Sequence, residues 1–522
     1  MLSVQGLATV KYSPTLGRII GREEEQIDTA GIETIERLLD YLREISGEAA
    51  EVLLDEQGSL KSTARILIND LPLGDAINQR IRQGDVITVI PSILKVYFEA
   101  YGCSASLADA EMTIGQLLMD GFELAKSPEE ADANIIVTCT VKSATANHMI
   151  SRIGRLSSTN LPLVVAGCMP KTELATIEKI NPKASMLGPN SIEKSVEVVR
   201  SAIAGKKLII IDDSQRPKLQ LPRLRMNPII EILEIASGCL SACTFCQVKI
   251  SKGRLRSYPI DQITEEADRA IREGCKEIWL TSTDNGCYGK DMGTSIAELI
   301  NSVSNVEGNF WIRVGMMNPI HLRRITNALF KSYSNSKVFK FLHMPVQSGS
   351  EPILKAMRRG HTVKDLEVLA DAFRNAFALS SLSTDIIVGY PGESPGDFEE
   401  TLSLIERVQP EVVNISKFGA RAGTEASKLK QLPTDVVSSR TKELVDLVKS
   451  TGRIRNERWL GWEGEIIVDE KGTKQGTWVG RNVAYRPVVV ASSEKLLGKT
   501  VEVRINDVTS TYLLGNVVGR AA

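Results

Sequence analysis

IASGCLSACTFCQ, residues 235–247, holds three cysteines in a C-x3-C-x2-C spacing: Cys239, Cys243 and Cys246. The stretch continues an apolar run, IIEILEIA (229–236), which predicts a buried strand. Four thiolates saturate a cubane iron–sulfur cluster, so three thiolates leave one iron open for chemistry. The spacing therefore predicts a cluster held by one loop at the carboxyl end of a strand.

A second set of three cysteines is spread along the sequence, and each member ends an apolar run typical of a buried strand. The runs are KVYFEAYGC (ending at Cys103), ANIIVTC (ending at Cys139) and LPLVVAGC (ending at Cys168). The carboxyl ends of parallel strands share one edge of a sheet, where ligand sites gather, so we expect the three thiols to converge. They predict a second cluster with an open iron. The alternative, buried structural cysteines, would scatter the thiols along the strands.

The remaining cysteines, Cys275 and Cys287, are interpreted as small core residues. Zinc is the main alternative for the compact triad of Cys239, Cys243 and Cys246. A structural zinc site needs four ligands, and His321, the nearest histidine in sequence, lies 75 residues beyond Cys246. The sequence therefore favours iron and sulfur over zinc.

The bulk composition is that of a globular protein with several domains. Of the 522 residues, 43% are hydrophobic and 24% are charged. Neither a secretory signal nor an apolar stretch long enough for a membrane span is found, which predicts a cytoplasmic location and no membrane partner. With 63 Lys and Arg against 64 Asp and Glu, the net charge permits a nucleic-acid partner without indicating one.

The order of strand-like and helical segments predicts a multidomain α/β protein. The predicted domains are a β-grasp ubiquitin-like module (1–93), an α/β domain with a parallel sheet (94–205), a linker (206–228), a partial (β/α)6 barrel (229–456) and a small β-barrel (457–522). The partial barrel rests on six strand-like runs with helical stretches between them, and its active residues are expected at the carboxyl ends of the strands.

The N-terminal module has apolar positions at helical spacing over 32–42, followed by β-branched runs. Its tail, ILINDLPLGDAINQRIRQGDVITVIP (66–91), resembles the ubiquitin-like sulfur carriers of molybdopterin and thiamine synthesis. Those carriers end in a free Gly-Gly carboxylate, whereas here the chain continues after Pro91. We therefore expect a structural or docking role for this module.

The loop GCLSACTFCQ after a strand resembles the cluster loop of radical S-adenosylmethionine (SAM) enzymes. The motifs YGCSASLADAE, TCTVKSATAN and VVAGCMP resemble the three cysteine motifs of MiaB-like methylthiotransferases, and the resemblance is nearest to their archaeal and eukaryotic branch. Further matches are TSTDNGCYG, WIRVGMMNP, LHMPVQSGSEPILKAMRRGHT, STDIIVGYPGESPGDFEET and ARAGTEA. The C-terminal segment resembles a TRAM domain, an RNA-binding barrel of the OB type.

This resemblance implies a transferase that modifies tRNA with two 4Fe–4S clusters and SAM. The cluster on the compact triad makes a 5′-deoxyadenosyl radical, and the auxiliary cluster on Cys103, Cys139 and Cys168 presents sulfur. The implied product carries a methylthio group at C2 of N6-threonylcarbamoyladenosine, beside the anticodon. The implied partners are the tRNA anticodon stem-loop and a reductant such as a ferredoxin or flavodoxin, and the source of the sulfur is not indicated. Two alternatives stay open: a methylthiotransferase acting on a ribosomal protein side chain, and a non-catalytic iron–sulfur RNA-binding protein.

Three positions depart from the family pattern. The usual asparagines are absent after the first auxiliary cysteine, where Ala105 and Ser106 stand, and before the second, where Thr138 stands. Phe418-Gly419-Ala420 replaces a frequent tyrosine before the signature Arg421-x-Gly423-Thr424. Because the cysteines themselves are intact, we expect the missing asparagines at Ala105, Ser106 and Thr138 to change only the tuning of the auxiliary cluster.

Other polar residues at predicted strand ends are candidates for binding SAM. Thr283 and Asp284 are expected at its amino end, Arg313 and Gln347 at its carboxylate or ribose, and Phe245 and Gly389 at its adenine. His343, at another strand end, is interpreted either as a core histidine or as a substrate contact. In the terminal barrel, the expected RNA contacts are Arg481, Arg486, Lys499 and Arg504, and Trp478 and Tyr485 are candidates for stacking on bases.

Overall fold

The structure is a computed structural model that describes residues 6–12, 14–55, 59–61, 64–69, 71–72, 79–91, 94–140, 143–212 and 218–520. The chain divides into two compact units, one of residues 1–97 with 117–133 and the other of residues 98–116 with 134–522. Each unit is considered by itself. The last two residues of the predicted N-terminal module, Ser92 and Ile93, lie outside the described residues.

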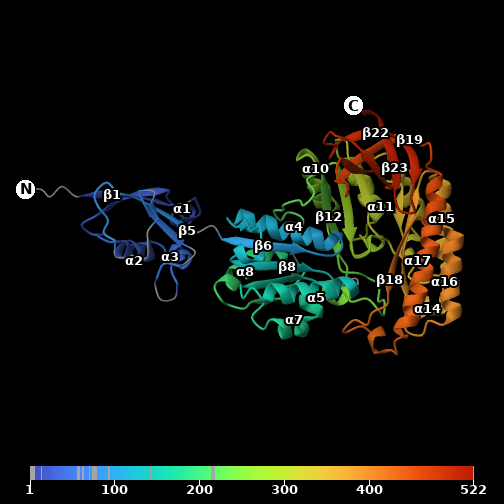
Figure 1. The fold of residues 1–522 in the computed structure, drawn as a ribbon, viewed down its shortest axis with the longest axis horizontal. Helices are drawn as coiled ribbons and strands as arrows, with labels where there is room; N and C mark the ends of the chain where they lie inside the picture. Colours follow the sequence, from blue (N-terminus) through green and yellow to red (C-terminus); the bar gives the residue numbers. More distant parts are fainter. Residues whose placement is uncertain are drawn as a thin grey trace, which may run out of the picture. The chain divides into compact units, whose positions relative to one another are not determined.

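The N-terminal module is a five-stranded mixed sheet in the order β2-β1-β5-β3-β4, with the parallel pair β1 and β5 at its centre. Helix α2 is capped by Thr34, whose hydroxyl accepts from the Arg37 N–H, and of the expected apolar positions it buries Ile35, Leu38, Leu39 and Leu42. This is the predicted β-grasp arrangement (Figure 1). The elements are β1 (Leu7–Tyr12), α1 (Pro14–Ile20), β2 (Glu24–Asp28), α2 (Ile35–Ile45), α3 (Gly47–Leu53), β3 (Ala64–Ile68), β4 (Leu71–Pro72) and β5 (Val86–Pro91).

The next segment is a parallel α/β sheet, as predicted. Strands β8, β9, β10 and β11 pair in parallel, and β6 pairs in parallel with β7. All six residues of β8 are buried, as expected for a parallel strand covered on both faces. The strands are β6 (Lys95–Ala100), β7 (Glu123–Leu124), β8 (Ala133–Thr138), β9 (Leu163–Gly167), β10 (Ser185–Leu187) and β11 (Ile209–Ile210). The helices are α4 (Ser104–Met119), α5 (Ser143–Ser157), α6 (Met169–Thr172), α7 (Leu174–Ile180) and α8 (Ser195–Ile203).

Six parallel strands then form the open barrel. β12, β14 and β15 pair in one sheet and β16, β17 and β18 in another. A parallel bridge between Ile312 and Val338 joins the two sheets, so the six strands follow one another in chain order. The strands are β12 (Ile230–Ser237), β14 (Glu277–Ser282), β15 (Trp311–Val314), β16 (Phe341–His343), β17 (Ser381–Val388) and β18 (Val412–Lys417), with a short antiparallel strand, β13 (Arg256–Ser257), beside β12.

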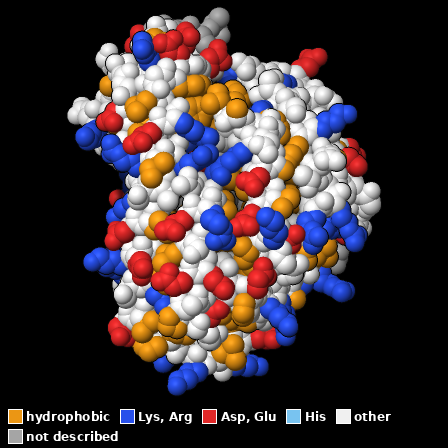
Figure 2. Space-filling model, turned by 90° about the vertical axis from the view of Figure 1, so that its right-hand side faces the viewer, with side chains coloured by type: hydrophobic (Ala, Val, Ile, Leu, Met, Phe, Trp, Pro, Cys, Tyr) orange, Lys and Arg blue, Asp and Glu red, His pale blue; other side chains and the backbone are white. Residues whose placement is uncertain are grey.

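Helices cover the outer face of the barrel strands and bury the largest apolar core of the protein between helix and sheet. They are α10 (Ile260–Arg272), α11 (Ile296–Ser304), α12 (Pro319–Leu322), α13 (Thr326–Tyr333), α14 (Glu351–Ala356), α15 (Val363–Ala376), α16 (Pro395–Val408) and α17 (Thr434–Glu457), whereas the short helix α9 (Val248–Lys252) contributes nothing to this core. On the face that carries α15 and α16, basic and acidic side chains are interspersed (Figure 2), as in the ion pair of Arg407 with Glu367 (2.9 Å). No one-sign patch dominates the described residues of this face.

The C-terminal segment is a closed five-stranded barrel in the order β19-β20-β21-β23-β22. Its strands are β19 (Glu463–Lys471), β20 (Thr477–Arg481), β21 (Pro487–Ala491), β22 (Thr500–Val508) and β23 (Leu513–Arg520). Four of these strands were expected from the sequence, and β20 was not. The fold class predicted from the sequence, multidomain α/β with a small terminal β-barrel, is therefore confirmed. Among the described residues, no helix is long and apolar enough to cross a membrane.

Candidate functional site: two cysteine triads

The structure brings Cys103, Cys139 and Cys168 together at the carboxyl ends of β6, β8 and β9. The end of β6 lies beside β8, because the Tyr101 N–H donates to the Val137 carbonyl (3.1 Å). A hydrogen bond with the Cys139 thiol lowers the pKa of Cys103 well below its ordinary value. The Cys168 thiol is close enough to Cys103 for the two to interact electrostatically. The convergence expected from the strand pattern is therefore seen in the geometry.

Glycines precede Cys103, Cys168 and Cys239, and each adopts a positive φ at the end of its strand. At Gly102 a Cβ atom would lie 2.3 Å from the Cβ of Cys139, and at Gly238 it would lie 1.9 Å from the Arg254 carbonyl oxygen. Only glycine combines that backbone conformation with such close approach. This strand–Gly–Cys pattern was visible in the sequence and was not used to locate the site.

The compact triad lies in the loop after β12. The Cys246 N–H donates to the Cys243 carbonyl (3.1 Å), and the Cys239 sulfur accepts from the Ser241 N–H (3.3 Å). The sulfur of Cys287 lies within 4.8 Å of the Cys239 sulfur, and its interaction lowers the pKa of Cys239 to about 6. A thiolate is the form that binds metal. Cys287 is buried, as expected of a core residue, and it lies beside the triad.

Helix α9 links the two triads within the second unit. It begins two residues after Cys246, and its last two residues, Ser251 and Lys252, lie beside the auxiliary cysteines. Burial raises the pKa of Cys168 to about 11, while the Lys252 ammonium acts in the opposite direction. A five-residue helix therefore spans from one set of thiols to the other.

A buried quartet of charges surrounds the end of this helix: Asp109, Lys218, Glu234 and Lys252. The Lys218 ammonium lies 2.5 Å from a carboxylate oxygen of Asp109 and 2.5 Å from one of Glu234. Lys252 pairs with Glu234 and lies 3.9 Å from Asp109. The four side chains are 1 to 3% exposed and come from α4, the predicted linker, β12 and α9. The two positive and two negative charges balance. Their ion pairs hold α4, the helix that follows Cys103, against β12, the barrel strand that precedes the compact triad.

Both triads fit an iron–sulfur cluster by the chemistry of their donors. Each offers three sulfur atoms, the soft ligands that such clusters take. Among the described residues, the group of three possible ligands whose ligand atoms all lie within 4.8 Å of one another is Cys239, Asp284 and Cys287, which shares one cysteine with the compact triad. None of the six cysteines of the two triads forms a disulfide bond.

The candidates for binding SAM lie at several places in the barrel. Asp284 is buried at the end of β14, where its carboxylate accepts from the Gly286 and Asn318 N–H groups (3.0 Å each), and burial raises its pKa to about 7. Thr283, next to it, is half-buried, and Phe245 packs partly buried beside Met357 and Tyr390. These residues lie close in sequence or in space to the compact triad, and their contact with SAM stays a prediction.

Gln347 and Gly389 have positive φ values of 82° and 80°. A Cβ atom at Gly389 would lie 2.5 Å from the Val437 side chain, so close packing explains why this residue is glycine. An approach of adenine to Gly389 stays a prediction. Arg313 lies over the rings of Trp279 (4.8 Å), Phe341 (5.9 Å) and Tyr485 (5.4 Å). Because Tyr485 belongs to the terminal barrel, Arg313 contributes to the contact between the two barrels, and its expected role toward SAM has no support in this geometry.

A polar cluster on β16, β17 and β18 was not singled out from the sequence, apart from His343. The His343 Nε2 atom lies 3.2 Å from the Asp385 Oδ1 atom, which also accepts from the Asn414 side chain (2.7 Å). All three are half-buried. Burial alternates beside His343 and Asp385, but the first five residues of β18 are all half-buried, so a period-two pattern did not mark Asn414.

The four expected RNA contacts differ in their exposure and in their partners in the terminal barrel. Lys499 and Arg504 are exposed, and they form loose ion pairs with Glu494 (3.8 Å) and Glu463 (3.5 Å). Arg486 is only 1% exposed, and its guanidinium donates to the carbonyls of Glu411 and Thr511. The expected RNA contact of Arg486 is therefore wrong, because its guanidinium is buried and hydrogen-bonded within the protein.

Arg481 is held by the carboxylates of Asp469 (2.7 Å) and Glu470 (2.6 Å) and lies over the Tyr485 ring. Tyr485 packs against Phe339, with ring centroids 4.8 Å apart, and Trp478 packs on the core of the terminal barrel. These contacts favour a packing role for the three residues over contact with RNA.

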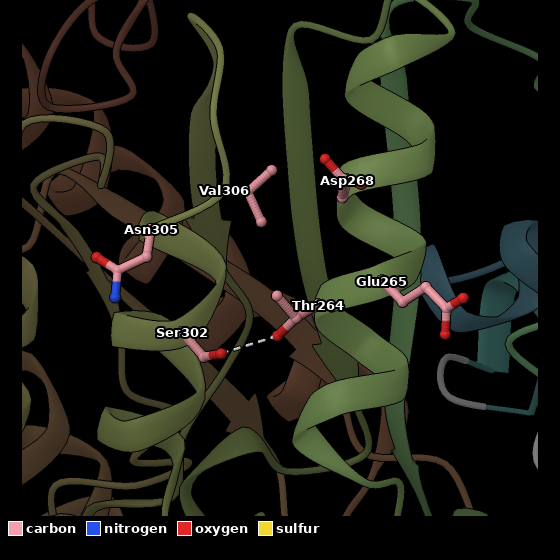
Figure 3. Close-up of a pocket in the computed structure, with 6 residues that line it drawn as sticks. All are labelled: Thr264, Glu265, Asp268, Ser302, Asn305 and Val306. Carbon is pink, nitrogen blue, oxygen red and sulfur yellow. Dashed lines mark hydrogen bonds between the residues drawn. The ribbon is translucent and has the colours of Figure 1, made fainter.

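A shallow groove on the outer surface lies away from the cysteines, between α10 and α11 (Figure 3). It is lined by Thr264, Glu265, Asp268, Ser302, Asn305 and Val306. The Thr264 and Ser302 hydroxyls share a hydrogen bond (2.9 Å) across it. None of the predicted site residues lines this groove, so it is not part of the candidate site.

Comparison with known families agrees with the geometry. Three family models match: "Uncharacterized protein family UPF0004" at residues 95–188, "Radical SAM superfamily" at 233–405 and "TRAM domain" at 458–518. The match at 233–405 covers the compact triad and the barrel strands from β12 to β17. Fold and site thus define a radical SAM protein.

Two of the relatives illustrate a similarity that extends over most of the chain. The probable threonylcarbamoyladenosine tRNA methylthiotransferase of Pyrococcus horikoshii is 38% identical over 429 residues, which are 82% of this chain and 100% of that protein. The human threonylcarbamoyladenosine tRNA methylthiotransferase is 34% identical over 442 residues, 83% of this chain and 76% of that protein. The chain belongs to the threonylcarbamoyladenosine tRNA methylthiotransferase family, which confirms the family predicted from the motifs.

Among solved structures, the radical SAM methyltransferase TsrM from Kitasatospora setae matches with a TM-score of 0.49 and 11% identity, over 64% of this chain and 77% of that one. Membership of the radical SAM superfamily implies SAM and a 4Fe–4S cluster as cofactors.

Proposed function

We propose that this chain is a radical SAM methylthiotransferase that modifies C2 of N6-threonylcarbamoyladenosine beside the anticodon of tRNA. The observation that carries the proposal is the convergence of Cys103, Cys139 and Cys168 beside α9, the helix that follows the compact triad. A radical SAM enzyme that only abstracts hydrogen has no need of a second open set of thiols. The names of the relatives from Pyrococcus horikoshii and human agree with this substrate.

Each triad is proposed to hold one 4Fe–4S cluster. Bound at Cys239, Cys243 and Cys246, the cluster with SAM supplies a radical that removes an unactivated hydrogen, and bound at Cys103, Cys139 and Cys168, the auxiliary cluster supplies an open iron for sulfur. The protein contributes the rest. Contacts with Cys139 and Cys287 lower the pKa of Cys103 and of Cys239, which favours the ligating thiolate, whereas burial raises the pKa of Cys168 and of Cys246 to about 11.

The charge quartet around Lys252 fixes the distance between the two triads, because each of its members is buried and paired. The barrel places half-buried polar groups, among them His343 and Asp385, on strands whose carboxyl ends lie near the compact triad. Fixed geometry of this kind contributes to rate by holding reacting groups in position. The tRNA stem-loop, a ferredoxin- or flavodoxin-type electron donor and a cytoplasmic location belong to the same proposal.

The experiment is a pair of anaerobic incubations of the reconstituted full chain with dithionite and SAM, one with tRNA that carries N6-threonylcarbamoyladenosine and one with ribosomal protein. Mass spectrometry of the digested nucleosides should show the methylthio derivative, together with 5′-deoxyadenosine. A triple variant, Cys103→Ala with Cys139→Ala and Cys168→Ala, should still release 5′-deoxyadenosine and form no methylthio nucleoside. If the wild-type chain releases 5′-deoxyadenosine but modifies only a ribosomal protein, the proposed substrate is wrong. If it releases none, a non-catalytic RNA-binding role is favoured.

A further inference from the structure

Arg359 lies against the compact triad from a distant part of the chain. It follows α14, and its side chain reaches the loop after β12, where its Nη1 atom donates to the Cys243 sulfur at 3.2 Å. Its Nη2 atom donates to the Pro345 carbonyl at 2.6 Å, which fixes the plane of the guanidinium. The residue is 7% exposed. A buried cation is therefore held, by two hydrogen bonds in different directions, against a sulfur of the triad.

Among the described residues no carboxylate lies within ion-pair distance of Arg359, and its buried Nε atom has no hydrogen-bond partner there. A buried charge is costly unless an anion compensates it. The two neighbouring histidines, His321 and His361, supply no anion, since burial lowers the pKa of each to about 4 and both are neutral at pH 7. The Asp284 carboxyl group interacts electrostatically with Arg359 without an ion pair between them. The group that the guanidinium contacts is the sulfur of Cys243, which is a thiolate when it ligates a cluster.

Hydrogen bonds to ligating sulfurs and nearby charges are the means by which a protein tunes the reduction potential of an iron–sulfur cluster. A second donor already faces the same triad, since the Ser241 N–H donates to the Cys239 sulfur. Arg359 differs from it because a full positive charge accompanies the hydrogen bond. Reduction adds one electron and hence one negative charge to a cluster, so a fixed cation stabilises the reduced form over the oxidised form.

We propose that Arg359 is a positioning residue that orients the Cys243 sulfur and raises the reduction potential of the cluster bound by the compact triad. This inference rests on the proposed function only in requiring that the triad holds a 4Fe–4S cluster. The electron comes from a chemically poised mediator in the test and from the reductant in turnover, and no atom is transferred. Among the described residues, Arg359 is a cation at the compact triad that neither the spacing of the cysteines nor the matched family models assign.

The neighbouring residue, Arg358, provides a matched control. It carries the same charge one position earlier in the chain, but its side chain is 55% exposed and pairs with Glu425 at 2.6 Å on the surface. Replacing it changes the net charge by the same amount without touching the triad. A difference between variants at 358 and 359 therefore isolates the contact with Cys243.

The test is a redox titration of the reconstituted full chain, followed by the electron paramagnetic resonance signal of the reduced cluster that changes on addition of SAM. Arg359→Gln should lower the equilibrium constant for reduction at least tenfold, which for one electron is about 59 mV toward negative potential. Arg359→Lys, which keeps the charge but not the forked geometry, should fall between Arg359→Gln and the wild type, and Arg358→Gln should titrate like the wild type.

Iron content and the visible absorption of each variant show whether the cluster is present. If Arg359→Gln loses iron, the reduction potential of the cluster in Arg359→Lys tests the inference instead. A wild-type potential in whichever of these variants retains its cluster would overturn the inference while leaving the proposed function intact. A wild-type chain that binds no cluster at Cys239, Cys243 and Cys246 would instead refute the proposed function, and the inference with it.

Discussion

Gly102 and Cys139 approach each other so closely that a Cβ atom on residue 102 would lie 2.3 Å from the Cβ and 3.0 Å from the sulfur of Cys139. Gly102 precedes Cys103 and has a φ of 132°. The contact joins the end of β6 to the end of β8 and brings two of the auxiliary thiols together. The auxiliary site therefore depends on a glycine as well as on three cysteines.

Gly102→Ala should disrupt the auxiliary site selectively. The added methyl group requires a shift of the backbone around Cys139, because residue 102 has a conformation that alanine rarely adopts. We expect the variant to bind about half of the wild-type iron and to keep the release of 5′-deoxyadenosine, with loss of the methylthio product. Gly154→Ala, at a position where a Cβ would meet no atom within 4 Å, serves as the control. Full iron binding by Gly102→Ala would show that the site tolerates the methyl group.

Lys252→Met should destabilise the protein strongly. Removal of the Lys252 ammonium leaves two buried carboxylates, Asp109 and Glu234, facing the single ammonium of Lys218. Breaking a buried pair in this way costs about 3–5 kcal/mol. Thermal unfolding should show a clear drop in melting temperature, whereas Lys194→Met, which removes an exposed pair with Glu197, should change it little. Equal effects of the two substitutions would contradict a structural role for the quartet.

Glu277 should make stability depend on pH. Burial, with a smaller contribution from Asp469, raises the pKa of Glu277 to about 8 from an ordinary value near 4.5. Between these values the folded state keeps a proton that the unfolded state releases. Stability should therefore fall as pH rises through this window, by up to about 1.4 kcal/mol per pH unit.

Glu277→Gln removes that proton and keeps an oxygen that accepts from the Trp279 ring N–H. Melting temperatures of the variant should change less between pH 5 and pH 8 than those of the wild type, and substitution of the exposed Glu465 by Gln should leave the wild-type dependence in place. If Glu277→Gln retains the full pH dependence, Glu277 is already ionised in the folded protein.

RNA binding by the terminal barrel is expected to involve Lys499 and Arg504, whose side chains are 49% and 60% exposed. Each phosphate contact contributes about one unit to the slope of log affinity against log salt concentration. Lys499→Gln and Arg504→Gln should each reduce that slope for the anticodon stem-loop by about one. Arg407→Gln, on the face with interspersed charges, should not change it. An unchanged slope in both barrel variants would place the RNA elsewhere.

Much of the fold and both triads followed from patterns of short range in the sequence. The six barrel strands were marked by apolar runs, and the three auxiliary cysteines by their place at the ends of such runs. Since parallel strands end at a common edge, the spacing of Cys103, Cys139 and Cys168 along the chain did not matter. Strand β20 was missed because it is short and its residues are mostly half-buried, which gives no clear alternation.

Residues that act through tertiary contacts were beyond the reach of those patterns. Arg359 is 116 residues from Cys243, and nothing local distinguishes it from the exposed Arg358. Arg486 looked like a surface cation because most arginines are exposed, and only the folded chain supplies the Glu411 and Thr511 carbonyls that bury it. Cys287 had no pattern of its own, and its place beside Cys239 depends on the packing of two strand ends.

The central claim is that this chain holds two separate sets of cluster ligands. It is tested most directly by iron analysis and Mössbauer spectroscopy of the full chain after Cys239, Cys243 and Cys246 are all replaced by alanine and the protein is reconstituted anaerobically. The account predicts one remaining 4Fe–4S cluster, bound by Cys103, Cys139 and Cys168, and no release of 5′-deoxyadenosine. A variant that binds no iron would contradict the account.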